Sequence, residues 1–128
     1  MRTRILLADD HALVRRGLRL LLDAEPDLAV VAEAADGAEA VRACAGAGID
    51  LAVLDIAMPG MTGIEAAREI ARSAPDVRVL MLSMYDSEQY RVESFEAGAS
   101  GYVLKSVADR DLLGACRAAM RGEPFSAS

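Results

Sequence analysis

The stretch LAVLDIAMPGMTG, residues 51–63, places an acidic side chain directly after an apolar run. Residues 51–54 are apolar throughout, which is typical of a strand that is covered on both faces of a parallel sheet. Asp55 follows at once. A carboxylate at the end of so apolar a strand usually has a functional reason, so this stretch predicts both a buried strand and a candidate site at its end.

The rest of the chain repeats the same pattern around this strand. Apolar runs predict four further strands, and amphipathic segments with helical spacing separate all five. Asp36 and Gly37 break the chain before the second of these helices, and Gly98 stops the fourth. Short connections between alternating strands and helices predict an α/β fold with a parallel sheet between two helical layers. The other strands are expected at 4–8, 28–32, 77–82 and 101–104, and the helices at 12–24, 38–47, 63–74, 87–97 and 108–121.

Size and charge narrow the classes of function. The chain has 128 residues, enough for one domain, and a formal net charge of −6. An acidic chain repels phosphate backbones, so we expect no nucleic-acid contact by these residues. No signal peptide and no apolar run near the roughly 20 residues of a membrane span is present. Cys44 and Cys116 form no ligand motif and are expected to be apolar fillers in a reducing compartment, so we expect a cytoplasmic location without membrane contact.

Polar side chains follow four of the five predicted strands. The first strand ends in Asp9 and Asp10, the third in Asp55, the fourth in Ser83 and the fifth in Lys105. Functional groups of such sheets gather at the carboxyl ends of the strands. Carboxylates this close repel one another unless a cation lies between them, and hard oxygen ligands suit Mg²⁺. The pattern therefore predicts a magnesium site at this edge.

The same set of groups suits phosphoryl transfer to a carboxylate. Asp55 can attack phosphorus and form an aspartyl phosphate. The transfer requires the phosphoryl oxygens to be neutralised. Mg²⁺ can serve one oxygen, Lys105 a second, and Ser83 with the backbone amides near Ala57 and Met58 the third. Each residue taken alone has a commoner structural explanation, such as a turn hydroxyl or a surface charge; their occurrence together favours function.

Four motifs carry a resemblance to a known family: LLADDH (6–11), LAVLDIAMPGMTG (51–63), VLMLSMYD (79–86) and GASGYVLKS (98–106). They resemble the receiver domains of two-component response regulators over about residues 4–121. The opening and the last helix are similar to the subfamily with a LuxR-type helix-turn-helix, named after NarL and FixJ. The resemblance implies a flavodoxin-like (βα)₅ sandwich with five parallel strands in the order 2-1-3-4-5. It also implies a receiver domain over 1–121, with 122–128 beginning a linker to a DNA-binding domain that is absent here.

The resemblance also implies a role for each site residue. Asp55 is the phosphoacceptor. Asp9, Asp10 and Asp55 hold Mg²⁺ together with the backbone carbonyl of Ala57. Lys105 and Ser83 contact the phosphoryl group, and Ser83 and Tyr102 form the switch that responds to it.

The resemblance further implies partners. A sensor histidine kinase supplies the phosphoryl group from a phosphohistidine, and the chain promotes its own phosphorylation and dephosphorylation without acting as an enzyme on another substrate. His11 is expected to be a neighbour of the site and no phosphodonor. Leu13 and Leu20 lie away from the main apolar face of the first helix. They either contact the fifth helix or form a phosphorylation-linked homodimer, which in the full-length protein would control transcription through DNA.

One departure and three other functions stay open. Ser106 stands where many receivers have proline, so the isomer of the Lys105–Ser106 peptide is not fixed by sequence. A haloacid-dehalogenase-like phosphatase needs an acid at position 57, which is Ala57. A nucleotide or flavin module lacks its glycine-rich loop. A receiver-shaped scaffold that is never phosphorylated would usually have lost one of the site residues.

Overall fold

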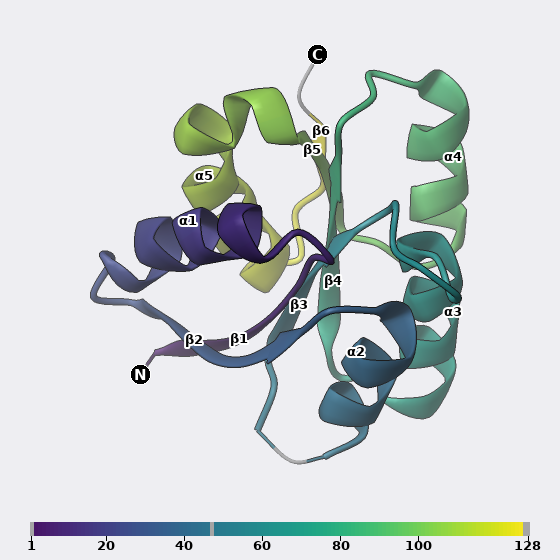
Figure 1. Cartoon of the computed structure of the whole chain (residues 1–128), viewed down its shortest axis with the longest axis horizontal. Helices are drawn as coiled ribbons and strands as arrows, with labels where there is room; N and C mark the ends of the chain where they lie inside the picture. The colour runs from purple at the N-terminus through teal and green to yellow at the C-terminus, as the bar shows by residue number, and fades with distance from the viewer. Residues whose placement is uncertain (1, 47, 127–128) are drawn as a thin grey trace.

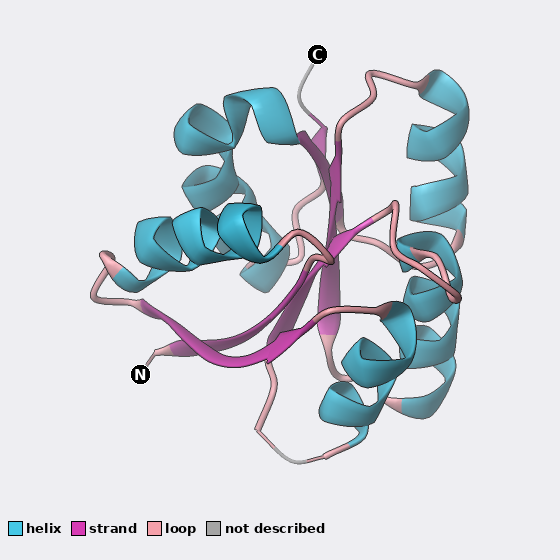
Figure 2. Cartoon of the chain, viewed as in Figure 1, coloured by secondary structure: helices cyan, strands magenta, loops and turns pink. Residues whose placement is uncertain are grey.

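The computed structural model describes residues 2–46 and 48–126 and shows three layers (Figure 1). A twisted sheet forms the middle layer, α1 and α5 cover one face, and α2, α3 and α4 cover the other (Figure 2). The elements in chain order are β1 (Thr3–Ala8), α1 (Ala12–Asp23), β2 (Leu28–Ala34), α2 (Gly37–Ala45), β3 (Leu51–Asp55), α3 (Gly63–Ser73), β4 (Arg78–Ser83), α4 (Glu88–Glu96), β5 (Gly101–Leu104), a short 3₁₀ helix (Lys105–Val107), α5 (Ala108–Met120) and β6 (Phe125–Ser126).

The strand order confirms the flavodoxin-like prediction and adds one strand. The sheet runs β2-β1-β3-β4-β5-β6, and every neighbouring pair is parallel. The segment 122–128 was expected to be only the beginning of a linker. Within this segment, β6 pairs with β5 through Gly101–Phe125 and Tyr102–Ser126, so the chain continues along the sheet edge after α5. Residues 127 and 128 lie outside the described residues, and the domain boundary at 121 stays a prediction.

The central strands are apolar over most of their length because they contact helices on both faces. Along β1, Ile5 and Leu7 belong to the core under α1 and α5, whereas Leu6 and Ala8 belong to the core under α2, α3 and α4. All five residues of β3 are buried. This two-sided burial explains why the apolar runs show no alternation.

Side-chain caps set the starts of three helices. Asp36 accepts a hydrogen bond from the Glu39 amide at 2.8 Å and caps α2. Thr62 and Glu65 form a capping box at α3. Ser87 caps α4. The second predicted helix ended at 47, a residue outside the described part, and α2 ends at Ala45. Among the described residues, no helix has the length and apolar character to cross a membrane.

Candidate functional site

The carboxyl ends of the strands bring two acids and one lysine into direct contact. Asp9 follows β1, Asp55 ends β3, and Lys105 follows β5. Lys105 Nζ lies 2.7 Å from Asp9 Oδ2 and 3.0 Å from Asp55 Oδ2. Both acids are buried, at 0% and 2% exposure. The structure therefore brings together three of the predicted site residues that lie 46 and 50 positions apart.

The buried charges do not balance, because two carboxylates share one ammonium group. Burial raises the pKa of Asp55; the hydrogen bond from Lys105 opposes this shift, and the charge of Asp9 adds to it. Burial alone would lower the pKa of Lys105, but its bonds to Asp9 and Asp55 outweigh burial and raise that pKa. Lys105 is thus held in its charged form, and the site retains excess negative charge that a cation would neutralise.

Asp10 and His11 complete the acidic cluster. The His11 amide donates to Asp9 Oδ1 at 2.9 Å, and His11 Nδ1 lies 3.2 Å from Asp10 Oδ1. Ligand atoms from Asp9, Asp10, His11 and Asp55 all lie within 4.8 Å of one another. Carboxylate oxygens in such a group fit the preference of Mg²⁺ for hard ligands.

Ala57 contacts Asp55 through its backbone amide, and the role of its carbonyl as a magnesium ligand stays a prediction. Its amide donates to Asp55 Oδ1 at 3.3 Å, so the backbone after β3 turns back toward the carboxylate. Asp55, Ala57 and Ser83 line one pocket of about 400 Å³ between the strand ends and α3 and α4. Although Asp55 is almost fully buried, its carboxyl group therefore borders an open space.

Ser83 and Tyr102 converge on a third residue, Tyr85, in the loop after β4. Ser83 Oγ accepts from the Tyr85 amide at 2.9 Å and donates to the Tyr85 carbonyl at 3.2 Å. The Tyr102 hydroxyl donates to the same carbonyl at 2.7 Å, and its ring is fully buried. The Arg91 guanidinium lies 5.1 Å from the centre of that ring. The hydroxyl of Ser83 is thus engaged within the loop, and Tyr102 shares its acceptor.

Leu13 and Leu20 are exposed, at 83% and 68%. The alternative that they pack against α5 within one chain is therefore wrong. The peptide bond between Lys105 and Ser106 is trans.

Two features of the site were not found from the sequence. Gly63 lies so close to β3 that a Cβ atom on it would be 2.1 Å from the Asp55 carbonyl oxygen. Arg15 in α1 donates from Nη1 to the Asp9 carbonyl. Gly63, the second glycine of the MPGMTG segment, was a usable signal for the close approach to β3, whereas nothing in the sequence marks the bond from Arg15.

The sequence matches the response regulator receiver domain family over residues 5–117. It is 39% identical over 124 residues to the response regulator UvrY of Escherichia coli strain K12, covering 97% of this chain and 57% of UvrY. It is 41% identical over 123 residues to the oxygen regulatory protein NreC of Staphylococcus epidermidis, covering 95% and 56%. The chain thus spans a little over half the length of the curated relatives it matches.

Solved structures agree with this match. The fold superposes on a two-component response regulator of the LuxR family from Aurantimonas sp. with a TM-score of 0.93 and 42% identity, covering 98% of this chain and 89% of that one. It superposes on the response regulator domain of CheB from Thermotoga maritima with a TM-score of 0.88 and 31% identity, covering 97% and 100%.

Proposed function

This chain belongs to the response regulator receiver domain family, and from that premise we propose that Asp55 accepts a phosphoryl group with Mg²⁺ bound beside it. Receiver domains bind Mg²⁺ at an acidic pocket, and response regulators are phosphorylated by sensor histidine kinases. The observation that carries the proposal is the contact of Lys105 with both Asp9 and Asp55, at 2.7 and 3.0 Å. It puts a fixed positive charge beside Asp55, which, unlike Asp9, also borders the pocket.

In the proposed reaction, a carboxylate oxygen of Asp55 attacks the phosphorus of a phosphohistidine in line with the P–N bond. An O–P bond forms, the P–N bond breaks, and its electron pair returns to the donor imidazole, which takes a proton from solvent. The Lys105 ammonium is already hydrogen-bonded to Asp55 and can follow the negative charge onto a phosphoryl oxygen.

Asp9, Asp10 and Asp55 are the proposed magnesium ligands, with the Ala57 carbonyl as the backbone ligand. The bound ion would supply positive charge that neutralises phosphoryl oxygens. The donor set supports this assignment because oxygen atoms of all three carboxylates lie within 4.8 Å of one another. The ammonium group of Lys105, which contacts two of these acids, cannot balance both. Asp10 has the most exposed side chain of the three, so it is the most accessible of the proposed ligands.

Ser83 and Tyr102 are the proposed switch. A phosphoryl group on Asp55 offers a charged acceptor at the pocket that Ser83 also lines. If Ser83 turns toward it, its two bonds to Tyr85 break, and the Tyr85 carbonyl keeps only the Tyr102 hydroxyl. The shared acceptor supports a coupling between the state of Asp55 and the position of the Tyr102 ring.

For the longer protein, we propose a DNA-binding output domain after residue 121 and a homodimer through α1. The chain covers 57% of its relative UvrY, so these relatives contain further sequence. The exposed Leu13 and Leu20 support an apolar contact on α1. Within this scheme the chain is a phosphoacceptor that catalyses only its own phosphorylation and dephosphorylation.

The decisive experiment is incubation with phosphoramidate and Mg²⁺ followed by intact mass measurement. The wild type should gain one phosphoryl group and Asp55→Asn should gain none. Asp50→Asn should behave as the wild type because the Asp50 carboxylate accepts from the Arg4 amide and lies at the other end of β3. Absence of a gain in the wild type would favour an unphosphorylated scaffold. Sustained turnover of p-nitrophenyl phosphate would favour a phosphatase.

A further inference from the structure

Arg15 lies one helical turn into α1 and reaches back to the acidic site. Its backbone amide bonds to the His11 carbonyl in the first turn of the helix, at 2.9 Å. Side chains of helical residues lean toward the helix N-terminus. Accordingly, the guanidinium returns past the helix start, and Nη1 donates to the backbone carbonyl of Asp9. The side chain is 19% exposed, so this contact is largely shielded from water.

The bond from Arg15 completes the fixation of the Asp9 backbone. The Asp9 amide donates to the Ala34 carbonyl at the end of β2, at 3.0 Å, and the Asp9 carbonyl accepts from Arg15. The Asp9 carbonyl and the Asp10 amide belong to the same planar peptide group. The direction of the carbonyl therefore fixes the orientation of the backbone where Asp10 follows. Among the described residues, the one oppositely charged contact found for the Asp10 carboxylate is with His11, and the neighbouring carboxylates of Asp9 and Asp55 repel it. Its position is therefore set mainly by the backbone.

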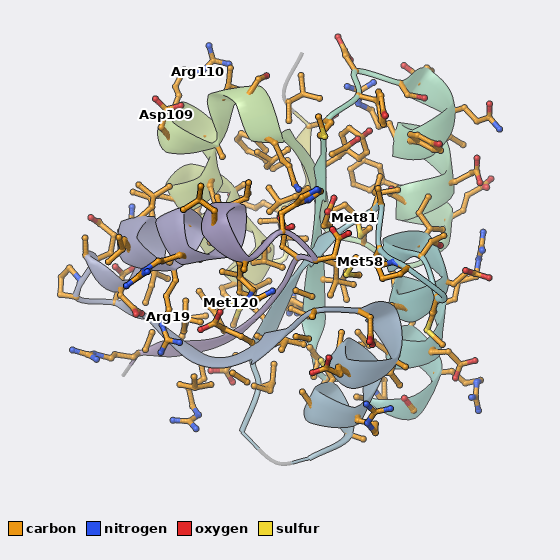
Figure 3. All side chains as sticks on the ribbon, in the orientation of Figure 1. Arg19, Met58, Met81, Asp109, Arg110 and Met120 are labelled. Atoms are coloured by element: carbon orange, nitrogen blue, oxygen red, sulfur yellow. The ribbon has the colours of Figure 1, made fainter. Side chains whose placement is uncertain are left out.

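A carboxylate on the edge strand holds Arg15 in place. Glu33 in β2 accepts from Arg15 Nε through Oε1, at 2.8 Å, and contacts Arg19 through Oε2. Burial would raise the pKa of Glu33, but the hydrogen bonds from the two arginines outweigh burial and lower it, so the carboxylate stays charged. Arg19 also donates to the Val30 carbonyl, at 3.3 Å, and reaches from α1 to β2 without a bond to Asp9 (Figure 3).

We propose that Arg15 is a positioning residue for the magnesium site, which acts by fixing the Asp9–Asp10 peptide and thereby the Asp10 carboxylate. The inference rests on the proposed function. The direction of the change in Mg²⁺ affinity distinguishes this positioning role from a simple charge effect. Removal of a positive charge near three carboxylates would by itself tighten Mg²⁺ binding, whereas loss of positioning weakens it.

Calorimetric titration of the 128-residue chain with Mg²⁺ tests the proposal. Arg15→Gln should raise the dissociation constant for Mg²⁺ about tenfold, at the lower end of the effects known for groups that orient metal ligands. Arg15→Lys keeps the charge and can make only one of the two bonds, so its dissociation constant should lie between those of Arg15→Gln and the wild type. Arg19→Gln is the matched control: it removes a partner of Glu33 but no bond to Asp9, and should leave the constant unchanged.

A second readout distinguishes positioning from general loosening. With phosphoramidate, Arg15→Gln should shift the Mg²⁺ concentration for half-maximal phosphorylation by the same factor as the dissociation constant and leave the rate at saturating Mg²⁺ close to wild type. Tighter binding in Arg15→Gln, or equal constants in Arg15→Gln and Arg19→Gln, would overturn the inference while leaving the proposed function intact. A wild type that binds no Mg²⁺ would overturn both. If Arg15→Gln folds poorly, Arg15→Lys decides the question.

Discussion

Replacement of Asp55 by asparagine is expected to stabilise the fold when Mg²⁺ is absent. Asp9 and Asp55 are both buried and share the single ammonium group of Lys105. Burial raises the pKa of Asp55 in spite of Lys105. A raised pKa in a carboxyl group means that folding disfavours its charged form. Asparagine has nearly the same shape and no charge, so it removes this unfavourable contribution and leaves Asp9 paired with Lys105.

The size of the effect follows from opposing contributions. At an effective dielectric constant of about 20, carboxylates within 4.8 Å of each other repel by roughly 3 kcal/mol or more, and the contact of 3.0 Å between Lys105 and Asp55 attracts by roughly 5 kcal/mol. Desolvation of the Asp55 carboxylate opposes folding by several kcal/mol. The direction of the pKa shift shows that the unfavourable contributions win, and because these contributions largely cancel we expect a net gain on the order of 1 kcal/mol. For a chain of this length, that gain corresponds to a rise of about 3–6 °C in Tm.

Urea denaturation followed by circular dichroism, with a chelator and with saturating Mg²⁺, measures the effect. With chelator, Asp55→Asn should be more stable than the wild type at pH 7. With Mg²⁺ the order should reverse, because the ion binds the native wild-type site and stabilises it by mass action. The pH dependence has a fixed sign. A carboxyl group with a raised pKa in the folded state binds protons there first, so the wild type gains stability as pH falls through that pKa, and the advantage of Asp55→Asn disappears below the ordinary value of 3.8.

Lys105→Met provides a control of opposite sign. It leaves two buried carboxylates without their ammonium group and should lower the free energy of unfolding by about 3–5 kcal/mol. The reasoning is refuted if Asp55→Asn is less stable than the wild type with chelator at pH 7. The attraction of Lys105 would then outweigh both burial and the repulsion from Asp9.

Three further predictions concern the rest of the fold. Leu13→Glu combined with Leu20→Glu should change the free energy of unfolding by less than about 0.5 kcal/mol and abolish phosphorylation-linked dimerisation in light scattering; an unchanged dimer would exclude this face of α1. Gly63→Ala should lower the free energy of unfolding by about 2 kcal/mol or more, because its Cβ would lie 2.1 Å from the Asp55 carbonyl oxygen. Gly17→Ala, whose Cβ would have no atom within 4 Å, should raise the free energy of unfolding by about 0.5–1 kcal/mol. Similar effects of the two substitutions would contradict this steric argument. Both cysteines are buried, with thiol pKa values raised by burial to about 11 and about 12, so a thiol reagent should label them only as fast as the chain unfolds; rapid labelling of the native protein would contradict their burial.

Most of the architecture could be predicted because strands buried on both faces have an unmistakable composition. The run before Asp55 is apolar at every position, and β3 is buried at every position. Residues that directly follow such strands must lie at the same edge of a parallel sheet. This topological rule placed Asp9, Asp55, Ser83 and Lys105 near one another without any knowledge of distances, and Lys105 contacts both acids.

The contacts that orient the site could not be predicted, since they depend on side-chain reach and not on strand order. The bond from Arg15 to the Asp9 carbonyl requires the rotation of α1 about its axis, which apolar spacing fixes only coarsely. The Tyr85 carbonyl accepts hydrogen bonds from both Ser83 and Tyr102. Because this acceptor is a backbone atom, no residue type in the sequence marks it. The strand β6 has only two residues, too few for a periodic pattern.

The separation of stability from function in this fold makes the site open to substitution. Two apolar cores, one on each face of the sheet, hold the strands in place. Met58 and Met81, on the side of α3 and α4, belong to one of these cores (Figure 3). The site itself opposes folding through its unbalanced buried charge. A substitution at Asp55 can therefore raise the free energy of unfolding and abolish phosphorylation at the same time. Such opposite effects on stability and on function are expected of a carboxylate that is retained for its chemistry.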